Sequence, residues 1–456
     1  MHEIDARTRL QVADSAHHLH PFCHPRDLNA AGTRILVRGR GVEIEDAAGQ
    51  TLLDAMAGLW CVNVGYGRTE LADAAAAQMR ELPYYNTFFG SATPPVIELA
   101  QTLARLAPGT LEHSFFSNSG SEASDTAIKL ARYYWYLRGE PQRQFVIARE
   151  YGYHGSTLGG ASLSHLSGMH ECFGLPIPGI AHIAAPYWYR HGGDASPEAF
   201  NLQCARALEE KILELGPEHV AAFIAEPIQG SGGLIVPDAG YWQEIRRICD
   251  RYEVLFIADE VITAFGRVGH WFGSELYGLE PDLVNLAKGL SSGYAPIACT
   301  MLGERVASVV VNEGGSFNHG YTYSGHPVAC AVALRNLRII EEEGLVERVR
   351  DDIGPYFQSR VRELADHPLV GDVRGVGLMV GLELVADKAN RRPFPEELGV
   401  GLRVHHTGFE NGLIVRAIRD VIVLAPPLVI SHAEVDRIID RLAWCLDKVG
   451  HGLRAA

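Results

Sequence analysis

The 456-residue sequence has few lysines, no closely spaced cysteine pair and no long apolar run. Acidic residues outnumber basic ones by 55 to 40, and the formal net charge of −15 argues against nucleic acid or an anionic membrane as the main partner. No apolar run approaches the roughly 18 residues that a membrane span requires. The apolar fraction of 47% is ordinary for a packed globular protein. We therefore expect a protein that acts on small molecules.

The cysteines and the N-terminus indicate a cellular compartment. The eight cysteines form no Cys-x-x-Cys pair and lie mostly in apolar surroundings, which is typical of reduced, buried side chains in a cytoplasmic protein. The first residues contain no apolar segment of a secretory signal. A histidine-rich stretch, HHLHPFCH, runs from His17 to His24, but it contains a proline and lacks the helical spacing of metal ligands. We expect a polar loop there and no metal.

Short, continuously apolar runs that end in polar or glycine-rich segments dominate residues 110–330. Such runs are typical of strands buried on both faces of a parallel sheet. The clearest are HSFFS, QFVIA, VAAFIAEP, VLFIADE and DLVNLAK. Helical stretches such as SEASDTAIKLARYYWYLRG and AGYWQEIRRICDRYE lie between them. Alternating strands and helices predict an α/β sheet.

Beyond residue 330 the pattern changes. Amphipathic helical segments are followed by a hairpin-like DVRGVGLMVGLELV and by a second strand pair within GLIVRAIRDVIVLAPPLVI. This succession predicts a smaller α+β domain. We expect a large domain over 71–330, a small C-terminal domain over 331–456, and an N-terminal segment, 1–70, that contributes to the small domain and to the entrance of the active site.

Two charged positions follow directly on apolar runs. VLFIADE ends at Asp259 and Glu260, and DLVNLAK ends at Lys288, 29 residues after Asp259. Both charges should emerge at the carboxyl ends of strands, where open α/β sheets bind ligands. Lys288 is one of only five lysines and lies between an apolar strand and a Gly-Ser loop. A desolvated lysine amine is nucleophilic and forms Schiff bases with carbonyl compounds. The alternatives are a helix cap for Asp259 and an ordinary surface position for Lys288.

A Schiff-base lysine with an acidic partner indicates pyridoxal 5′-phosphate (PLP), whose ring nitrogen a carboxylate keeps protonated. The segment SNSGSEASDTAIK offers a phosphate site, because the hydroxyls and amides of Ser119, Gly120 and Ser121 meet at a helix N-terminus. The same pattern also caps an ordinary helix. In EYGYHGST, Tyr153 can lie on one face of a heterocycle while Val261 packs on the other.

Together these motifs resemble the class III (omega) aminotransferases, which are PLP enzymes of fold type I. The resemblance covers nearly the whole chain through GLWCVNVGYG, ELPYYNTFF, SNSGSEA, GYHGST, AEPIQGSGG, ADEVITAFGR, LAKGLSSGY, NHGYTYSGHP and NGLIVRAIRD. It implies an α/β fold with a mostly parallel central sheet, helices on both faces and a smaller α+β domain. It also implies a homodimer, or a dimer of dimers, with active sites at the subunit interface.

The resemblance implies a role for each matched residue. Lys288 is expected to be the catalytic residue that forms the Schiff base with the cofactor. The residues expected to contact PLP are Ser119, Gly120, Ser121, Tyr153, His154, Glu226, Asp259, Val261 and, from the neighbouring subunit, Thr322. One departure is notable. The family commonly reads DEVQTG, whereas Ile262 and Ala264 stand here, so a hydrogen bond from that glutamine must be absent or supplied elsewhere.

The motifs GLWCVNVGYG, YNTFF and LIVRA look most like the amine:pyruvate and omega-amino-acid:pyruvate branch. That branch moves an amino group from a primary amine or omega-amino acid to a keto acid by a ping-pong mechanism. Arg416 is expected to bind the acceptor's carboxylate and to swing away from an apolar amine. The residues expected to line the substrate pocket are Phe22, Trp60, Phe88, Tyr153, Ser231, Arg416 and Ile418.

Other activities share parts of this pattern. A diamine:pyruvate aminotransferase, an aminomutase or a decarboxylase would carry the same cofactor motifs. The segment GLSSG also matches the G-x-S-x-G elbow of serine hydrolases, with Ser291 as nucleophile. That elbow leads into a helix, whereas GYAPIACTML contains a proline and then an apolar, β-like run. The sequence therefore disfavours a hydrolase.

Overall fold

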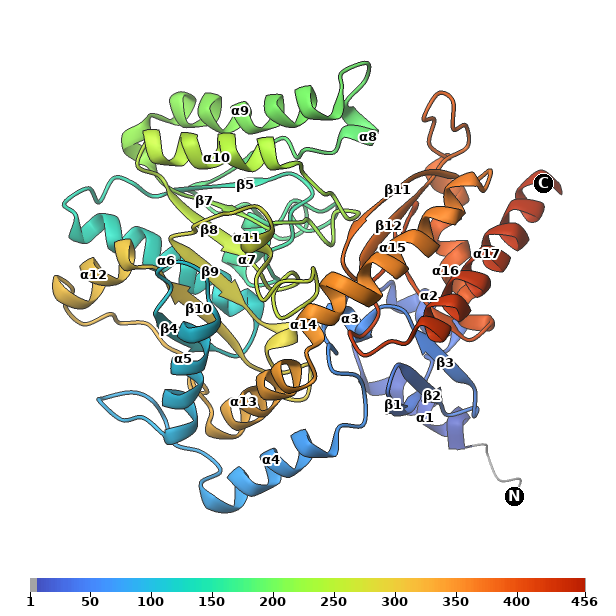
Figure 1. Ribbon diagram of the computed structural model, residues 1–456, viewed down its shortest axis with the longest axis horizontal. Helices are drawn as coiled ribbons and strands as arrows, with labels where there is room; N and C mark the ends of the chain where they lie inside the picture. The colour runs from blue at the N-terminus through green and yellow to red at the C-terminus, as the bar shows by residue number, and fades with distance from the viewer. Residues whose placement is uncertain (1–5, 456) are drawn as a thin grey trace.

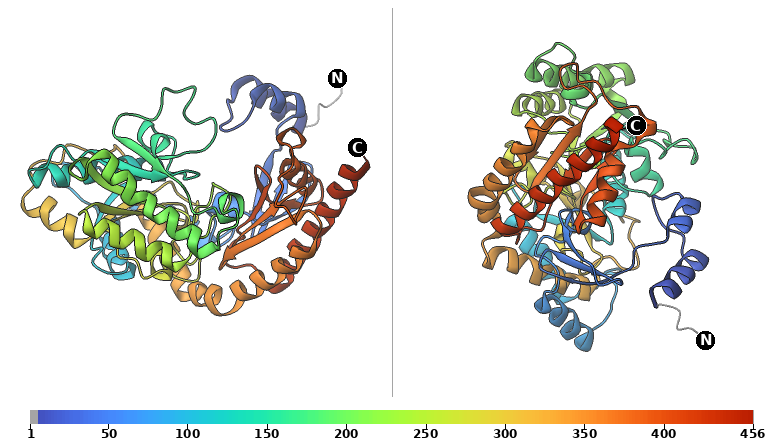
Figure 2. Two further views of the ribbon diagram at one scale, coloured as in Figure 1. Left: turned by 90° about the horizontal axis from the view of Figure 1, so that it is seen from above. Right: turned by 90° about the vertical axis from the view of Figure 1, so that its right-hand side faces the viewer.

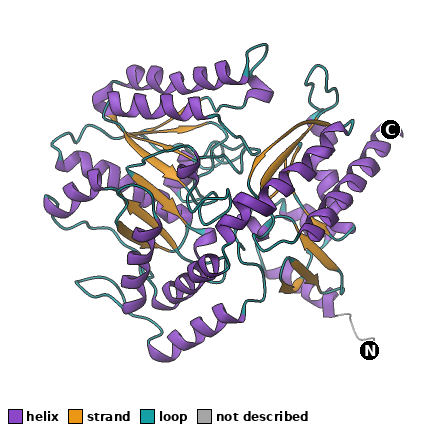
Figure 3. Ribbon diagram, in the orientation of Figure 1, coloured by secondary structure: helices purple, strands orange, loops and turns teal. Residues whose placement is uncertain are grey.

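The computed structural model describes residues 6–455 and contains three β-sheets (Figures 1 and 3). The largest has seven strands in the order β4-β10-β9-β8-β7-β5-β6. These strands are β4 (His113–Ser117), β5 (Phe145–Arg149), β6 (Ile180–Ile183), β7 (Val220–Ala225), β8 (Leu255–Asp259), β9 (Leu283–Leu286) and β10 (Ala298–Leu302). Only β10 runs against the others, since it pairs antiparallel with both β4 and β9. The predicted, mostly parallel α/β sheet is confirmed.

Both faces of this sheet are buried, which explains the continuously apolar strands. In β8, Leu255 and Ile257 pack in a cluster with two helices, whereas Phe256 and Ala258 pack on the opposite face with two others. The first pair of helices is α6 (Gly120–Leu137) and α12 (Glu304–Asn312), and the second is α9 (Pro197–Leu215) and α10 (Ala239–Arg251). Figure 1 shows α9 and α10 lying together along one side of the sheet.

A four-stranded antiparallel sheet forms in the C-terminal third, in the order β11-β12-β15-β14. Its strands are β11 (Val370–Val376), β12 (Met379–Leu384), β14 (Arg416–Ile418) and β15 (Val421–Leu424). The predicted hairpin is the pair β11 and β12, and the predicted second strand pair is β14 and β15. Three helices accompany this sheet, namely α15 (Gly354–Arg362), α16 (Val400–Glu410) and α17 (His432–Ala455).

The third sheet joins the two ends of the chain (Figure 2). Its strands are β1 (Leu36–Arg40), β2 (Glu43–Asp46), β3 (Thr51–Asp54) and β13 (Leu413–Ile414). Strand β13 runs parallel to β3, with Leu413 opposite Leu53. The N-terminal strands therefore lie beside the C-terminal third. The domain boundaries expected at residues 70 and 330 stay predictions, and residues 1–5 of the N-terminal segment lie outside the described residues.

The remaining helices connect or flank the sheets. They are α1 (Ala6–His17), α2 (Pro25–Ala31), α3 (Ala57–Trp60), α4 (Thr69–Glu81), α5 (Pro94–Leu106), α7 (Leu158–Leu163), α8 (Trp188–His191), α11 (Gly273–Leu276), α13 (Pro327–Glu342) and α14 (Leu345–Arg348). Helix α13 packs against α4 and α5. Within residues 6–455, no helix combines the length and the apolar character needed to cross a membrane.

The eight cysteines are all free, and five of them are buried. The expectation of burial is wrong for the other three, because Cys23 and Cys172 are exposed and Cys61 is half-buried. Cys23 lies within the histidine-rich stretch, and Cys172 lies in a turn. Both positions belong to surface segments that connect secondary structure elements, where local polarity does not reveal the packing.

Glu260, the residue after β8, anchors a loop from inside the core. Its side chain is fully buried and accepts hydrogen bonds from the backbone amides of Gly273 and Ser274, at 2.7 and 2.6 Å. The hydroxyls of Thr263 and Ser274 also donate to it. Burial raises the pKa of this carboxyl group, and these hydrogen bonds oppose the shift. Glu260 therefore ties the start of α11 to the end of β8.

We expect Glu260→Ala to destabilise the fold, because each orphaned buried amide costs about 1 to 3 kcal/mol. Urea unfolding and the melting temperature of the purified protein measure the effect. Glu98→Ala, at an exposed position in α5, is the control and should leave both nearly unchanged. Equal stability of the two variants would contradict this role for Glu260.

Candidate active site

Five strands of the large sheet deliver polar residues to the same edge. Because β4, β5, β7, β8 and β9 run in one direction, their carboxyl ends meet there. A cavity of about 660 Å³ opens at this edge, a volume in the usual range for a small-molecule site. The predicted residues that line it are Phe22, Trp60, Gly120, Ser121, Tyr153, His154, Glu226, Ser231, Asp259, Val261, Lys288 and Arg416.

At the floor of the cavity, Asp259 and His154 form a buried pair. The Oδ2 atom of Asp259 lies 2.7 Å from Nδ1 of His154, and both side chains are almost fully buried. A carboxylate can only accept, so the imidazole Nδ1–H donates. The Oδ1 atom of Asp259 accepts from the backbone amide of Val261 at 3.2 Å. His154 therefore holds Asp259 in one orientation at the end of β8.

Glu226 lies beside this pair at the end of β7. Its two oxygens accept from the backbone amides of Tyr153, at 3.1 Å, and Gly230, at 2.9 Å. Burial raises the pKa of Glu226, while the nearby His154 opposes the shift. The side chain thus connects the segment after β5 to the loop after β7.

Lys288, just beyond β9, reaches the same cavity. Burial lowers the pKa of its amine, and Asp259 opposes that shift. Its side-chain nitrogen Nζ lies 5.9 Å from the ring centroid of Trp60. Lys288 and Trp60 both have left-handed backbone angles, with φ of 41° and 54°, which are uncommon outside glycine and cluster at functional sites.

Arg416 approaches Trp60 from the C-terminal sheet. Its guanidinium carbon lies 4.9 Å from the Trp60 ring centroid, and burial lowers the pKa of the side chain. In the part of the chain that the structure describes, Arg416 forms neither an ion pair nor a hydrogen bond through its side chain. A largely buried, unpaired guanidinium is costly unless a ligand completes its interactions.

The predicted anion site lies at the N-terminus of α6. Ser119 caps this helix by accepting from the amide of Glu122 at 3.3 Å, so the first amides of the helix have no carbonyl partner within it. The loop around Gly155 packs tightly against it, since a Cβ at Gly155 would lie 2.6 Å from Cα of Ser121. The amide of Ser156 donates to the Ser121 hydroxyl at 3.0 Å.

The histidine-rich stretch holds one wall of the cavity. His18 and His20 lie within hydrogen-bond distance of Asp14, at 2.9 and 2.8 Å, and Thr33 donates to the same carboxylate. These contacts lower the pKa of Asp14. They fix the loop that carries Phe22, whose ring meets that of Tyr153 edge-on at 6.5 Å.

Four predicted residues do not line the cavity. Ser119 caps α6 and does not line the cavity. Ile418 is the last residue of β14, and its neighbour Ala417 lines the cavity instead. Thr322 is exposed and its carbonyl accepts from Tyr84 at 2.7 Å. Phe88 lines a different, open hollow of about 1080 Å³.

Some lining residues were not predicted. Leu166, Ser167 and Met169 form part of the wall, and no residue in their segment has a chemical character that would reveal this. Ile262 lines the cavity and packs with Trp60 in an apolar cluster, so it supplies no hydrogen bond. The hydroxyl of Ser291 donates to the carbonyl of Ala295 within a turn that leads to β10 and not to a helix, as the disfavoured hydrolase elbow would require.

Comparison with known proteins identifies the family. A sequence profile described as Aminotransferase class-III matches residues 28–446. The putrescine–pyruvate aminotransferase of Pseudomonas aeruginosa is 53% identical over 452 residues, which cover 99% of each chain. This chain is a class III aminotransferase. The aminotransferase is therefore PLP-dependent, as the sequence motifs predicted.

Two solved structures match this aminotransferase over nearly its whole length. The (S)-enantioselective omega-transaminase from Thermomicrobium roseum is 46% identical with a TM-score of 0.94, covering 97% of this chain and 98% of that one. The omega-transaminase from Pseudomonas jessenii in complex with PMP is 42% identical with a TM-score of 0.95, over 97% and 98%. The predicted fold type I architecture is confirmed.

The cavity of this aminotransferase fits PLP. The helix N-terminus at Gly120 and Ser121 suits a phosphate, Asp259 suits a protonated ring nitrogen, and the amine of Lys288 suits the aldehyde. When bound, the cofactor supplies a carbonyl carbon that takes up the amino group and a ring that withdraws electrons from it. Each of these needs is met by a residue that lines the cavity.

We expect borohydride to fix PLP on Lys288 alone, because burial keeps this amine available as a nucleophile. Peptide mass mapping of the reduced protein locates the label. Lys288→Ala should abolish labelling while the far-ultraviolet spectrum and melting temperature stay near normal. Lys129→Ala, at an exposed position, should label normally. Label on Lys129 or Lys448 in the wild type would contradict the assignment.

Proposed function

We propose that this aminotransferase moves an amino group from a primary amine, a diamine or an omega-amino acid to pyruvate. The single observation that carries the proposal is the unpaired Arg416 beside Trp60, in the cavity that also holds Lys288. The relative from Pseudomonas aeruginosa, which acts on putrescine and pyruvate by its name, supports the same pair of substrate classes.

Arg416 supports the acceptor specificity. A keto acid brings one carboxylate into a cavity whose own acids, Asp259 and Glu226, already have partners. Arginine offers a planar fork that matches a carboxylate with two hydrogen bonds. When the bound substrate has no carboxylate, the guanidinium can instead stack on the Trp60 ring.

Apolar walls support the donor specificity. Phe22, Trp60, Tyr153 and Met169 enclose the space in front of Lys288. An amine with an apolar chain loses little on entering such surroundings and gains from burial. The same cavity thus accepts an apolar donor and a charged acceptor in turn, as a ping-pong reaction requires.

We assign the proton transfer to Lys288. Its amine, with a pKa lowered by burial, takes the proton from the substrate carbon and later returns one, which is general base and general acid catalysis by the same nitrogen. Asp259 would supply the negative charge that keeps the cofactor's ring nitrogen protonated, and His154 keeps that carboxylate oriented. Tyr153 and Val261, which both line the cavity, would enclose the two faces of the ring.

The test is turnover of an amine panel with and without a keto acid. Putrescine, β-alanine and an arylalkyl amine are each mixed with the holoenzyme, and alanine is measured after pyruvate is added. We expect sustained turnover only with pyruvate present. Steady release of product without any keto acid would instead indicate an aminomutase or a decarboxylase.

Arg416→Ala separates the two half-reactions. A buried arginine–carboxylate contact contributes about 1.5 to 3 kcal/mol, so kcat/KM for pyruvate should fall about 10- to 150-fold. The half-reaction of the arylalkyl amine, followed by the change in cofactor absorbance, should stay near normal. Arg416→Lys keeps the positive charge but loses the planar guanidinium, so its kcat/KM for pyruvate should lie between those of the wild type and Arg416→Ala. Equal losses in both half-reactions would contradict a carboxylate clamp.

We also propose that the active unit is a homodimer. Thr322, which the family resemblance assigns to the phosphate of the neighbouring subunit, is exposed and does not line its own cavity. The hollow near it is rich in aromatic residues, and Phe89 at its rim is 99% exposed. An exposed apolar patch of this kind favours an interface with a second copy of the chain.

Thr322→Ala should weaken PLP retention without dissociating the dimer. Loss of one hydrogen bond to a charged phosphate costs about 1.5 to 3 kcal/mol, or about 10- to 150-fold in the dissociation constant of PLP. Equilibrium dialysis measures this constant, and light scattering measures the mass. Thr322→Ser, which keeps the hydroxyl, is the control. Fully active, PLP-saturated monomers of the wild type would contradict the dimer.

A further inference from the structure

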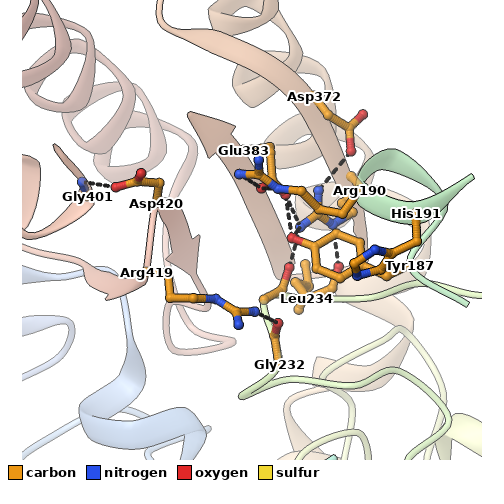
Figure 4. Close-up of polar contacts among 12 residues, drawn as sticks. Tyr187, Arg190, His191, Gly232, Leu234, Asp372, Glu383, Gly401, Arg419 and Asp420 are labelled. Carbon is orange, nitrogen blue, oxygen red and sulfur yellow. Dashed lines mark hydrogen bonds and ion pairs between the residues drawn. The ribbon is translucent and has the colours of Figure 1, made fainter. Parts of the chain in front are cut away.

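A buried cluster of charges joins the C-terminal sheet to the large sheet (Figure 4). At its centre is Glu383 of β12, whose side chain is completely buried. It accepts from Arg374 at 2.7 Å, from Arg190 at 2.5 Å and from the hydroxyl of Tyr187 at 2.6 Å. Arg374 belongs to β11. Tyr187 directly precedes α8, and Arg190 lies within that helix. Glu383 is therefore held from both sides of the junction.

Arg374 also binds the loop that follows β7. Its Nε atom donates to the carbonyl of Leu234 at 2.7 Å, and its Nη2 atom donates to the carbonyl of Gly233 at 2.5 Å. Its Nη1 atom donates to Asp372 at 2.8 Å. Besides its contacts to Glu383 and the Tyr187 hydroxyl, this side chain thus makes two contacts to loop carbonyls and one to a carboxylate in the same strand.

The same loop forms part of the cavity. Ser231 lines the cavity and is 5% exposed. On its N-terminal side, the amide of Gly230 donates to Glu226 at 2.9 Å. On its C-terminal side, Arg419 lies over the ring of Tyr151 and reaches the carbonyl of Gly232 at 3.5 Å. Arg374 of β11 and Arg419 of the turn between β14 and β15 therefore contact a loop that Glu226, at the end of β7, also holds.

The sheet that holds this loop also carries Arg416. Strand β12 pairs with β15, and β15 pairs with β14, so that Glu383 lies opposite Val421 and Arg416 lies opposite Val423. Backbone hydrogen bonds connect these strands directly. A shift of the sheet relative to the loop would therefore move Arg416 relative to Ser231.

We propose that Glu383 and Arg374 are positioning residues that set the width of the substrate pocket between Ser231 and Arg416. Neither residue lines the cavity. They act by fixing the C-terminal sheet, with its carboxylate clamp, against the loop after β7. Residues 187–190 and the β11–β12 hairpin, which are distant in sequence, meet at this one carboxylate, so its loss loosens the junction at one point and leaves the core of each sheet intact.

The energetics of buried charges favour this geometric role. Desolvation of a buried ion pair offsets most of its attraction, so such pairs contribute little net stability compared with apolar packing. Their directional contacts instead fix distances, and a misplacement of about 1 Å can cost about 100-fold in rate. Arg374 makes five such contacts with a fixed planar group, including one to the Tyr187 hydroxyl at 3.0 Å, and lysine cannot reproduce them.

The test uses Glu383→Gln and Arg374→Lys in the PLP-loaded enzyme, with Glu343→Gln as the matched control. Glu343 accepts hydrogen bonds from both Nη atoms of Arg68 at 2.7 Å, but this ion pair is partly exposed and does not line the cavity. Hydrogen exchange followed by mass spectrometry reports on residues 228–236 and 255–259 separately. The two half-reactions are measured with pyruvate and with a small apolar amine.

In both junction variants we expect exchange over 228–236 to rise about tenfold while 255–259 stays protected. The kcat/KM for pyruvate should fall about 10- to 100-fold, with a smaller effect on the amine half-reaction. Glu343→Gln should change neither. If Glu383→Gln does not fold, Arg374→Lys alone decides, because it keeps the positive charge beside Glu383.

Unchanged exchange over 228–236, or an equal loss in both half-reactions, would overturn the positioning role. The kinetic readout rests on the proposed function, whereas the exchange readout does not. If the wild-type enzyme shows no turnover with pyruvate, the proposed function is refuted. The exchange pattern of the variants would still decide whether Glu383 and Arg374 hold the loop.

Discussion

The pairing of β8 with β9 inside the large sheet is the constraint on which the site depends. Both strands are buried on both faces, so they can neither slip nor separate without exposing apolar surface. Their register places Asp259 opposite Asn285, three residues before Lys288. Asp259 and Lys288 thus come together because the burial of both strands fixes their register. The remaining groups are arranged around this pair.

Much of this arrangement could be predicted from the sequence, because it depends on where apolar runs end. Asp259, Lys288 and Glu226 each directly follow such a run, and their proximity follows from the parallel sheet. Phe88 and Thr322 could be matched to motifs, but neither lines the cavity of its own chain. Met169 and its neighbours could not be found at all, because ordinary side chains become a wall only through tertiary packing.

The buried charges of the molecule fall into two groups. Glu260 and Glu383 have every oxygen engaged by donors, and they hold loops and sheets in place. Among the residues that the structure describes, Arg416 and Lys288 have no carboxylate within hydrogen-bond distance. A satisfied charge resists movement, whereas an unsatisfied charge can exchange one partner for another at little cost. The first group builds the site, and the second group remains available for substrates.

The sheet formed by the two chain ends has a consequence for synthesis on the ribosome. Strand β13 must be present before β3 has its parallel neighbour, and β3 leads directly to Trp60. More than 350 residues separate Leu53 from Leu413. Since contacts between distant segments form late, the wall bearing Trp60 is completed only when translation is nearly over. The nascent chain therefore waits in an incomplete state, with the large sheet assembled and its cavity still open on one side.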